Sequence, residues 1–336
     1  MEAADIPARA EYSPRERLMG WADRRPGLAA TALLALIVLL LVASRGLHDV
    51  AQTSLNGLSL GSIYALGAVG LTLVYGILKL VNFAHGDFLT FGAYMAFLVN
   101  VTWGLPLAPA IVFAMAATAI MALAFERILW RPMRVRGAGL LQLLLMSIGL
   151  AFVIRAVVQY IWGTQIRDLD VDDTSSVVFL DLRIGETELI VIVIGFAVLM
   201  AVGLFLRYAL IGKQMRAIAD DIDLAETSGI DTQRIIYLTW FFSGGLAGLA
   251  GVLAAATTNV KPELGFELLL PIFAAVVLGG IGDAFGALAA GLVLGVVIEW
   301  STLFIEDRWK LAIGFIVLVI VLVIRPQGVF GKAKSI

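Results

Sequence analysis

The sequence predicts an all-α polytopic membrane protein of about ten membrane-crossing or re-entrant helices. Of its 336 residues, 60% are hydrophobic and 15% are charged, whereas soluble domains have roughly 45–50% apolar and about 25% charged residues. The mean hydropathy of +0.96 points the same way. A soluble fold could not cover so many apolar side chains, so the lipid bilayer is the expected environment.

Composition also excludes several classes of function. The chain has no cysteine, which rules out disulfides, thiolate metal sites and cysteine nucleophiles. It has two histidines, too few for a histidine-rich metal centre. The 24 Lys and Arg nearly balance 26 Asp and Glu, so no basic surface is expected for nucleic acid.

The chain opens with a polar arm, residues 1–27, which holds five arginines and no signal-peptide cleavage pattern. We expect this arm in the cytoplasm, followed by one membrane domain over 28–331 and a cytoplasmic tail over 332–336. Ten apolar stretches predict the crossings: 28–43, 50–78, 88–100, 107–125, 140–162, 189–206, 235–258, 268–278, 286–300 and 311–324.

Positive charges predict the orientation of these crossings. With both ends in the cytoplasm, the inside segments hold 17 of the 24 Lys and Arg, and the outside segments hold 6. The remaining cation, Arg155, lies inside a stretch. Because cytoplasmic loops are enriched in Lys and Arg, the bias favours ten crossings with an N-in, C-in topology.

The largest outside loop, about 163–188, is acidic. Its carboxylates either form a solvated surface or a docking surface for a partner outside the cytoplasm. They are Asp168, Asp170, Asp172, Asp173, Asp181, Glu186 and Glu188.

Glycines recur at the four-residue spacing that lets membrane helices approach closely. They do so at Gly57 and Gly61, Gly244 and Gly248, Gly282 and Gly286, and Gly291 and Gly295. The run Gly279–Asp283 instead breaks the stretch 268–300 into a pair of helices. Such breaks are tolerated where protein or water surrounds them, and transporters often place solute sites there.

A few polar residues interrupt the apolar stretches. Asn56 could contact a solute or another helix, and His85 could cap a helix together with Asp87. Arg155 could reach the membrane surface or pair with Glu299, and an intramembrane charge is a functional candidate.

No catalytic motif is present, and GKQM (212–215) and GKAK (331–334) lack the spacing of an ATP-binding loop.

The loop over 212–230 predicts an amphipathic helix at about 213–229. Met215, Ile218, Ile222, Ala225 and Gly229 share one stripe, and Asp220, Asp223 and Glu226 lie opposite. Membrane-surface helices favour a basic polar face, so we expect this acidic one to fit its stripe into a groove of a cytoplasmic protein.

Seven sequence blocks resemble the bacterial branched-chain amino-acid ABC-transporter permeases of the LivH/LivM type. The first is NGLSLGSIYALGAVGLTLVYGILKLVNFAHGDFLTFGAYMAF (56–97). The others are ERILWRPMR (126–134), MSIGLAF (146–152), GKQMRAIADDIDLAETSGI (212–230), GGLAGLAGVL (244–253), VLGGIGDAFGALAAG (277–291) and RPQGVFG (325–331). Together they cover about residues 50–331 in the family's order.

The resemblance implies a non-catalytic permease subunit in a bacterial or archaeal inner membrane. Its partners would be ABC ATPase subunits that bind ATP and Mg, a second permease or copy of itself, and an extracytoplasmic binding protein. The chain itself would bind no cofactor. The implied ATPase-coupling residues are Met215, Arg216, Ala217, Ile218, Asp220, Ile222, Ala225 and Gly229. The predicted substrate pathway comprises Asn56, Tyr64, Asn82, His85, Gly279, Gly280 and Gly282.

Three alternatives stay open on sequence grounds. The same architecture could import urea or short-chain amides, because those solutes need only neutral hydrogen-bond partners. An ion-coupled secondary transporter would need intramembrane carboxylates, of which the predicted crossings offer few beyond Glu299. A passive channel or a membrane-embedded structural subunit would have no use for a dedicated cytoplasmic helix.

Overall fold

A computed structural model describes residues 26–171, 175–179, 181–324 and 328. Residues 1–25 of the predicted arm lie outside this range, as do the tail 332–336, most of the RPQGVFG block, Asp172 and Asp173. The chain divides into two compact units, Met1–Val50 and Ala51–Ile336.

In the first unit, α2 (Pro26–Arg45) contains the predicted stretch 28–43. Pro26 is its first residue, a position where proline's fixed backbone angle suits a helix. Gly46 follows it with a φ of 90°, a conformation that glycine adopts readily beyond a helix end. The unit also contains the first residues of α3 (Leu47–Leu78).

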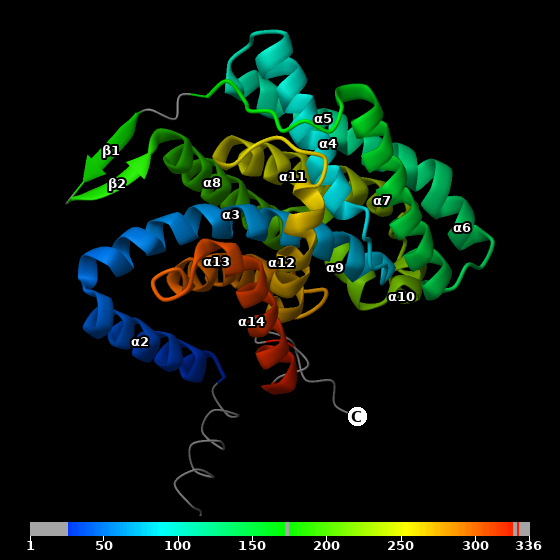
Figure 1. Cartoon of the computed structure of the whole chain (residues 1–336). Coiled ribbons are helices and arrows are strands. Elements are labelled where there is room, and N and C mark those ends of the chain that lie inside the picture. Colours follow the sequence, from blue (N-terminus) through cyan, green and yellow to red (C-terminus); the bar gives the residue numbers. More distant parts are fainter. Residues whose placement is uncertain (1–25, 172–174, 180, 325–327, 329–336) are drawn as a thin grey trace, which may run out of the picture. The chain divides into compact units, whose positions relative to one another are not determined.

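In the second unit, helices follow one another along the chain, and the connection between α7 and α8 contains a β-hairpin (Figure 1). After α3 they are α4 (His85–Phe97), α5 (Leu107–Phe125), α6 (Arg131–Val135), α7 (Leu140–Trp162), α8 (Glu186–Tyr208), α9 (Leu210–Asp220), α10 (Ile222–Thr227), α11 (Thr232–Thr257), α12 (Leu264–Gly279), α13 (Ala284–Ser301) and α14 (Lys310–Ile324). Two π-helical turns, η1 (Leu98–Thr102) and η2 (Glu126–Trp130), extend α4 and α5, and a 3-10 turn, η3 (Asp307–Trp309), precedes α14.

Among the residues that the structure describes, six helical segments are long and apolar enough to cross a membrane: Leu47–Leu78, Leu107–Val135, Leu140–Trp162, Glu186–Tyr208, Thr232–Thr257 and Ala284–Ser301. The predicted stretches at 88–100, 268–278 and 311–324 fall in shorter helices, α4, α12 and α14. The chain is therefore a predominantly helical, multi-pass membrane protein.

The predicted acidic loop contains an antiparallel hairpin of β1 (Ser176–Phe179) and β2 (Leu182–Gly185). β-branched and aromatic residues in Ser-Val-Val-Phe favour the strand. The side chain of Gln52 on α3 exchanges hydrogen bonds of 2.6 and 2.9 Å with the backbone of Arg183. Glu186 and Glu188 belong to the first turn of α8, where acidic side chains stabilise the positive end of a helix.

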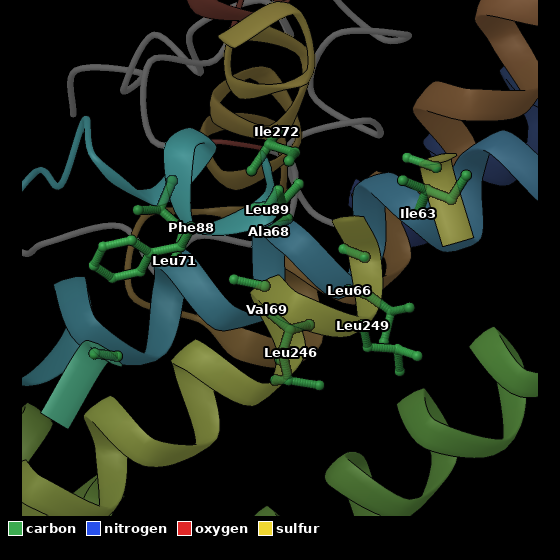
Figure 2. Packing of buried hydrophobic residues seen from close by; sticks show 14 of the residues in the cluster. Ile63, Leu66, Ala68, Val69, Leu71, Phe88, Leu89, Leu246, Leu249 and Ile272 are labelled. Carbon is green, nitrogen blue, oxygen red and sulfur yellow. The ribbon is translucent and has the colours of Figure 1, made fainter. Parts of the chain in front are cut away.

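The core of the second unit is built from α3, α4, α11 and α12. Figure 2 shows Leu66 and Val69 of α3 packed with Leu89 of α4, Leu246 of α11 and Ile272 of α12. α3 and α11 are mostly buried by other helices, whereas α5, α7 and α8 leave most of their side chains uncovered. Those uncovered side chains are largely apolar, as a surface in contact with lipid requires.

Glycine lets α3 and α13 touch backbone to backbone. A Cβ added to Gly61 would stand 2.7 Å from the carbonyl oxygen of Leu292, and one at Gly295 would overlap the backbone of Gly61. Two of the four predicted glycine pairs, Gly57/Gly61 and Gly291/Gly295, thus meet each other. Gly282 and Gly286 do not form such a pair, because Gly282 lies in a turn with a φ of 92°.

That turn breaks the stretch 268–300 into α12 and α13, as predicted. Gly280 and Gly282 both have a positive φ, of 97° and 92°, which glycine adopts without steric cost. The carboxylate of Asp283 then accepts hydrogen bonds from the backbone N–H groups of Phe285 (3.0 Å) and Gly286 (3.2 Å). Asp283 therefore caps the start of α13.

We expect Gly295→Ala to destabilise the protein by about 1–3 kcal/mol, the usual cost of overpacking. The added methyl group would overlap the backbone of α3, which cannot move as a side chain does. The thermal unfolding midpoint of the purified protein in detergent measures the effect. Gly149→Ala is the matched control, because a Cβ at Gly149 of α7 has nothing within 4 Å. An equal midpoint for both variants would contradict the close contact.

Candidate functional site

The segment predicted to dock on a partner forms two short helices. α9 ends where Asp221 takes an extended conformation (φ −155°, ψ 110°), and α10 starts at the next residue. The Asp221 carboxylate accepts a 2.9 Å hydrogen bond from the backbone N–H of Leu224. The prediction of one continuous helix over 213–229 is therefore wrong, because Asp221 caps a second helix. Gly229 follows α10 with a φ of 85°, as expected of a C-terminal stop.

Most of the predicted apolar stripe packs inside the chain itself. Met215, Ile218 and Ala225 are 3%, 2% and 3% exposed, so the prediction that they fill a groove of another protein is wrong. Their own membrane domain covers them instead. Ile222 (38%) and Leu224 (65%) are the exposed large apolar residues of α10. Among the other predicted contact residues, Arg216, Asp220 and Gly229 are exposed and Ala217 is half-buried.

The α9–α10 segment is tied to the end of α3. The Lys79 ammonium donates hydrogen bonds to the carbonyl oxygens of Gly76 (2.7 Å) and Ala219 (3.1 Å). Lys79 itself has a φ of 52°, which is uncommon outside glycine. A Cβ at Gly76 would lie 3.5 Å from the carbonyl oxygen of Gly282. The last turn of α9, the end of α3 and the α12–α13 turn therefore lie together.

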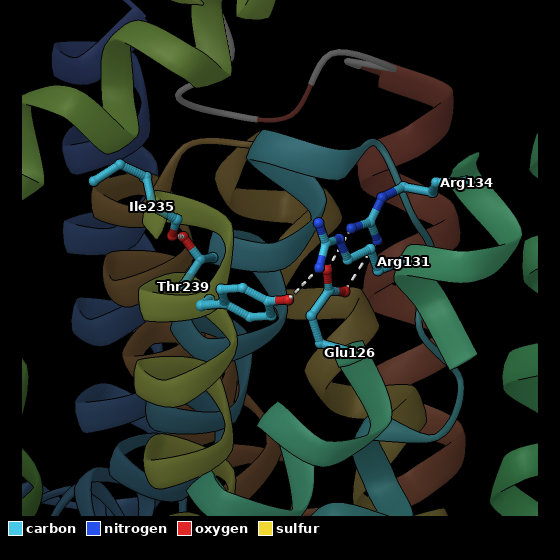
Figure 3. Close-up of polar contacts among 6 residues, drawn as sticks. Glu126, Arg131, Arg134, Ile235 and Thr239 are labelled. Carbon is cyan, nitrogen blue, oxygen red and sulfur yellow. Dashed lines mark hydrogen bonds and ion pairs between the residues drawn. The ribbon is translucent and has the colours of Figure 1, made fainter. Parts of the chain in front are cut away.

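A second set of contacts joins the 126–134 block to the base of α11 (Figure 3). Glu126 is fully buried and forms an ion pair with Arg134, including an Nη1–Oε2 hydrogen bond of 3.0 Å. Arg131 donates a 3.1 Å hydrogen bond to the hydroxyl of Tyr237. The rings of Trp130 and Trp240 stack with centroids 5.7 Å apart. The 126–134 block therefore packs directly against the first half of α11.

The predicted pathway residues lie at separate points on α3 or next to it. Asn56 is half-buried and accepts a 3.3 Å hydrogen bond from Gln52, and Tyr64 is buried. His85 is fully buried and makes a 2.9 Å hydrogen bond to the carbonyl oxygen of Gly67. Asn82 is 1% exposed. Further along α3, Gly279, Gly280 and Gly282 form the α12–α13 turn near Gly76.

The intramembrane cation pairs with Asp87. Arg155 of α7 donates hydrogen bonds of 3.1 and 3.3 Å to the two carboxylate oxygens of Asp87, and its guanidinium carbon lies 4.7 Å from the ring centre of Phe266. The expected pair with Glu299 is absent from the described contacts, because Glu299 instead pairs with Lys310 at 2.9 Å. Asp87 does not cap α4, whose N-cap residue has no side-chain hydrogen bond.

The pairing ties three helices together. Asp87 lies in the first turn of α4, Arg155 on α7, and Phe266 on α12. One turn beyond Arg155, Gln159 donates a 3.2 Å hydrogen bond to Glu263, directly before α12. Sequence analysis identified Arg155 and Asp87 as separate candidate residues. Their ion pair joins residues 68 positions apart, so no local sequence pattern reveals it.

A pocket of about 300 Å³ opens where α11 ends and α12 begins. We call it the α11–α12 pocket. Its apolar lining comes from Leu60, Ile63, Ala254, Leu264 and Leu268, and its polar lining from Thr257, Thr258, Asn259, Lys261 and Glu267. None of the predicted pathway residues lines it. Sequence reasoning missed it because its polar residues fall within and on both sides of the short connection between α11 and α12, which showed no binding motif.

The family profile described as "Branched-chain amino acid transport system / permease component" matches residues 53–322, which include both the pocket and the α9–α10 segment. The chain belongs to this family of transport permeases. It is 32% identical over 300 residues to the high-affinity branched-chain amino acid transport system permease protein LivH of Salmonella typhimurium, covering 84% of this chain and 96% of that protein.

Two further permeases are similar to this family member. BraD of Pseudomonas aeruginosa is 33% identical over 297 residues, covering 84% of this chain and 96% of BraD. LivM of Escherichia coli is 29% identical over 341 residues, covering 90% of this chain and 75% of LivM. Both are described as permease proteins of high-affinity branched-chain amino acid transport systems. The permease therefore resembles both LivH and LivM proteins.

Proposed function

We propose that this permease is the membrane-spanning, non-catalytic subunit of an ABC importer for branched-chain or related small amino acids. The observation that carries the proposal is the match to the permease family over 53–322. The similarity to LivH and BraD over most of their length agrees with it. The proposed permease domain is residues 28–331, in a bacterial or archaeal inner membrane.

The proposed topology has ten crossings with both ends in the cytoplasm. The crossings are α2, α3, α4 with η1, α5 with η2, α7, α8, α11, α12, α13 and α14. Contacts between residues near the ends of these crossings support this order. On one side, Lys79 contacts Ala219 and Arg131 contacts Tyr237. On the other side, Asn100 contacts Asp170 through two hydrogen bonds.

The excess of Lys and Arg assigns the first of these sides to the cytoplasm. The α9–α10 segment would then face an ATPase subunit with its exposed side chains. Without an ATP-binding loop of its own, the permease needs an outside source of energy. Shifting the permease between two conformations, from a population ratio of 1:99 to one of 99:1, takes roughly 5.5 kcal/mol. We assign this free energy to the binding and hydrolysis of ATP, with Mg, in the ATPase subunit.

The proposed assembly also includes a second permease and an extracytoplasmic binding protein. Similarity to both LivH and LivM supports a pair made either of two copies of this chain or of two related chains. The hairpin and the carboxylates of 163–188 lie on the side opposite the α9–α10 segment in this topology. That side is where a binding protein would dock.

Reconstitution tests the proposal. Liposomes would contain this permease together with the second permease and the ATPase subunits of the proposed assembly. The binding protein, loaded with leucine or with urea, would be added outside the liposomes. We expect ATP hydrolysis and solute uptake to rise with the leucine-loaded form. A rise with only the urea-loaded form would contradict the amino-acid assignment. No dependence of ATP hydrolysis on this chain would contradict the importer itself.

A further inference from the structure

The α11–α12 pocket carries one cation, one anion and an apolar wall within about 300 Å³. Its volume lies at the lower end of the range for ligand pockets, roughly 300–1,000 Å³, which suits a solute of few heavy atoms. In the proposed topology α11 runs away from the cytoplasmic α9–α10 segment. The pocket at its far end therefore opens toward the extracytoplasmic side.

The two charged side chains of the pocket form an ion pair with each other, and a charged solute can replace this contact. The Lys261 ammonium lies 2.7 Å from a carboxylate oxygen of Glu267, with side chains 27% and 49% exposed. Partly solvated ion pairs are weak, so a ligand that offers an opposite charge to each partner can replace the contact. Because the pair sums to zero charge, it matches a solute that carries one charge of each sign.

Three further side-chain oxygens of the pocket, those of Thr257, Thr258 and Asn259, can accept hydrogen bonds. The Thr258 hydroxyl donates its hydrogen to the carbonyl oxygen of Ala254 at 2.8 Å, and the Thr257 hydroxyl donates to carbonyl oxygens of the same helix. Their oxygens therefore keep free lone pairs. The side-chain oxygen of Asn259 is buried and has no hydrogen-bond partner among the described residues. An ammonium group, with three N–H donors, would satisfy such acceptors.

We propose that the α11–α12 pocket is a transit site for an aliphatic α-amino acid in its zwitterionic form. Lys261 binds the carboxylate, Glu267 and Asn259 accept hydrogen bonds from the ammonium group, and the apolar wall contacts the side chain. The inference rests on the proposed importer function and adds the solute-binding residues. Urea carries no charge to replace either partner of the Lys261–Glu267 pair and has no side chain to contact the apolar wall.

The test uses the same reconstituted complex with leucine-loaded binding protein. Lys261→Gln and Glu267→Gln each remove one charge-assisted contact with the solute, so we expect leucine uptake to fall about tenfold or more. The matched control is the ion pair of Arg308 and Glu306, which has the same 2.7 Å separation but lies outside the pocket and is 72% and 70% exposed. Arg308→Gln and Glu306→Gln should leave uptake unchanged.

A second measurement separates solute binding from a structural role of the ion pair. The chain has no cysteine, so Thr258→Cys introduces its single thiol, at an exposed position of the pocket rim. Leucine-loaded binding protein with ATP should slow modification of this thiol by a charged thiol reagent, while Asp307→Cys, exposed and outside the pocket, should react at an unchanged rate.

The outcomes distinguish the two proposals. ATP-driven leucine uptake by the unmodified complex, undiminished in both pocket variants, would overturn the transit site alone. Equal protection of Thr258→Cys by urea-loaded and leucine-loaded binding protein would overturn the zwitterion assignment. Failure of the unmodified complex to take up leucine would overturn the importer function on which the site rests.

Discussion

Replacing Asp87 with Asn, or Arg155 with Gln, is expected to destabilise the folded permease by about 3–5 kcal/mol. Asp87 is 1% exposed and the Arg155 side chain 15%. Their two hydrogen bonds, 3.1 and 3.3 Å, compensate for the removal of both charges from water. Either single substitution leaves one buried charge without its partner. The thermal unfolding midpoint of the purified protein in detergent measures the loss.

The double variant Asp87→Asn/Arg155→Gln distinguishes pairing from packing. It removes both charges at once, so it should recover a large part of the loss that each single variant shows. Glu306→Gln, in an exposed ion pair on the segment before α14, serves as the control and should unfold like the unmodified protein. Single variants that also unfold like the unmodified protein would show that the ion pair does not stabilise the fold.

Leu224→Asp is expected to reduce ATP-driven uptake to background while the protein still folds and inserts. Leu224 is 65% exposed on α10, so a carboxylate there remains solvated when the permease is alone. Against an ATPase subunit the same carboxylate would be desolvated without a partner, which costs several kcal/mol. Uptake and ATP hydrolysis in the reconstituted complex, together with co-purification of the ATPase subunit, measure the effect. Ile222→Asp should act in the same direction.

Val135→Asp is the matched control for the coupling surface. Val135 is 81% exposed on α6, on the same proposed side of the membrane but in a different loop. Its variant should keep both uptake and ATPase co-purification. Met215→Asp, in contrast, should impair folding because Met215 is 3% exposed. Normal uptake by the Leu224→Asp protein would exclude α10 from the ATPase contact.

Much of the architecture could be predicted because the membrane imposes long apolar helices. The stretches 107–125 and 140–162 coincide with α5 and α7, and the break of 268–300 at its glycines is present. The apolar stripe over 213–229 predicts one amphipathic helix, whereas the structure divides the segment at Asp221 into α9 and α10. A stripe at helical spacing looks the same whether a helix is continuous or capped in the middle.

The candidate site was less accessible to sequence reasoning. The stripe of Met215, Ile218 and Ala225 predicted an apolar face correctly but assigned it to a partner instead of to the chain's own core. Periodicity reveals which residues avoid water, and it does not reveal what covers them. Arg155 was likewise recognised as an intramembrane charge, whereas its partner Asp87 could be found only in three dimensions.

By itself, the sequence determined that this chain is a multi-pass membrane protein of the branched-chain amino acid permease family. Composition and span length follow directly from the need to bury apolar side chains in lipid, and the family blocks are contiguous in the chain. Only the tertiary structure decided the Asp87–Arg155 pair, the covered face of α9 and the α11–α12 pocket. Each involves residues far apart in the sequence, and packing between such residues follows from the arrangement of the helices and not from any local pattern.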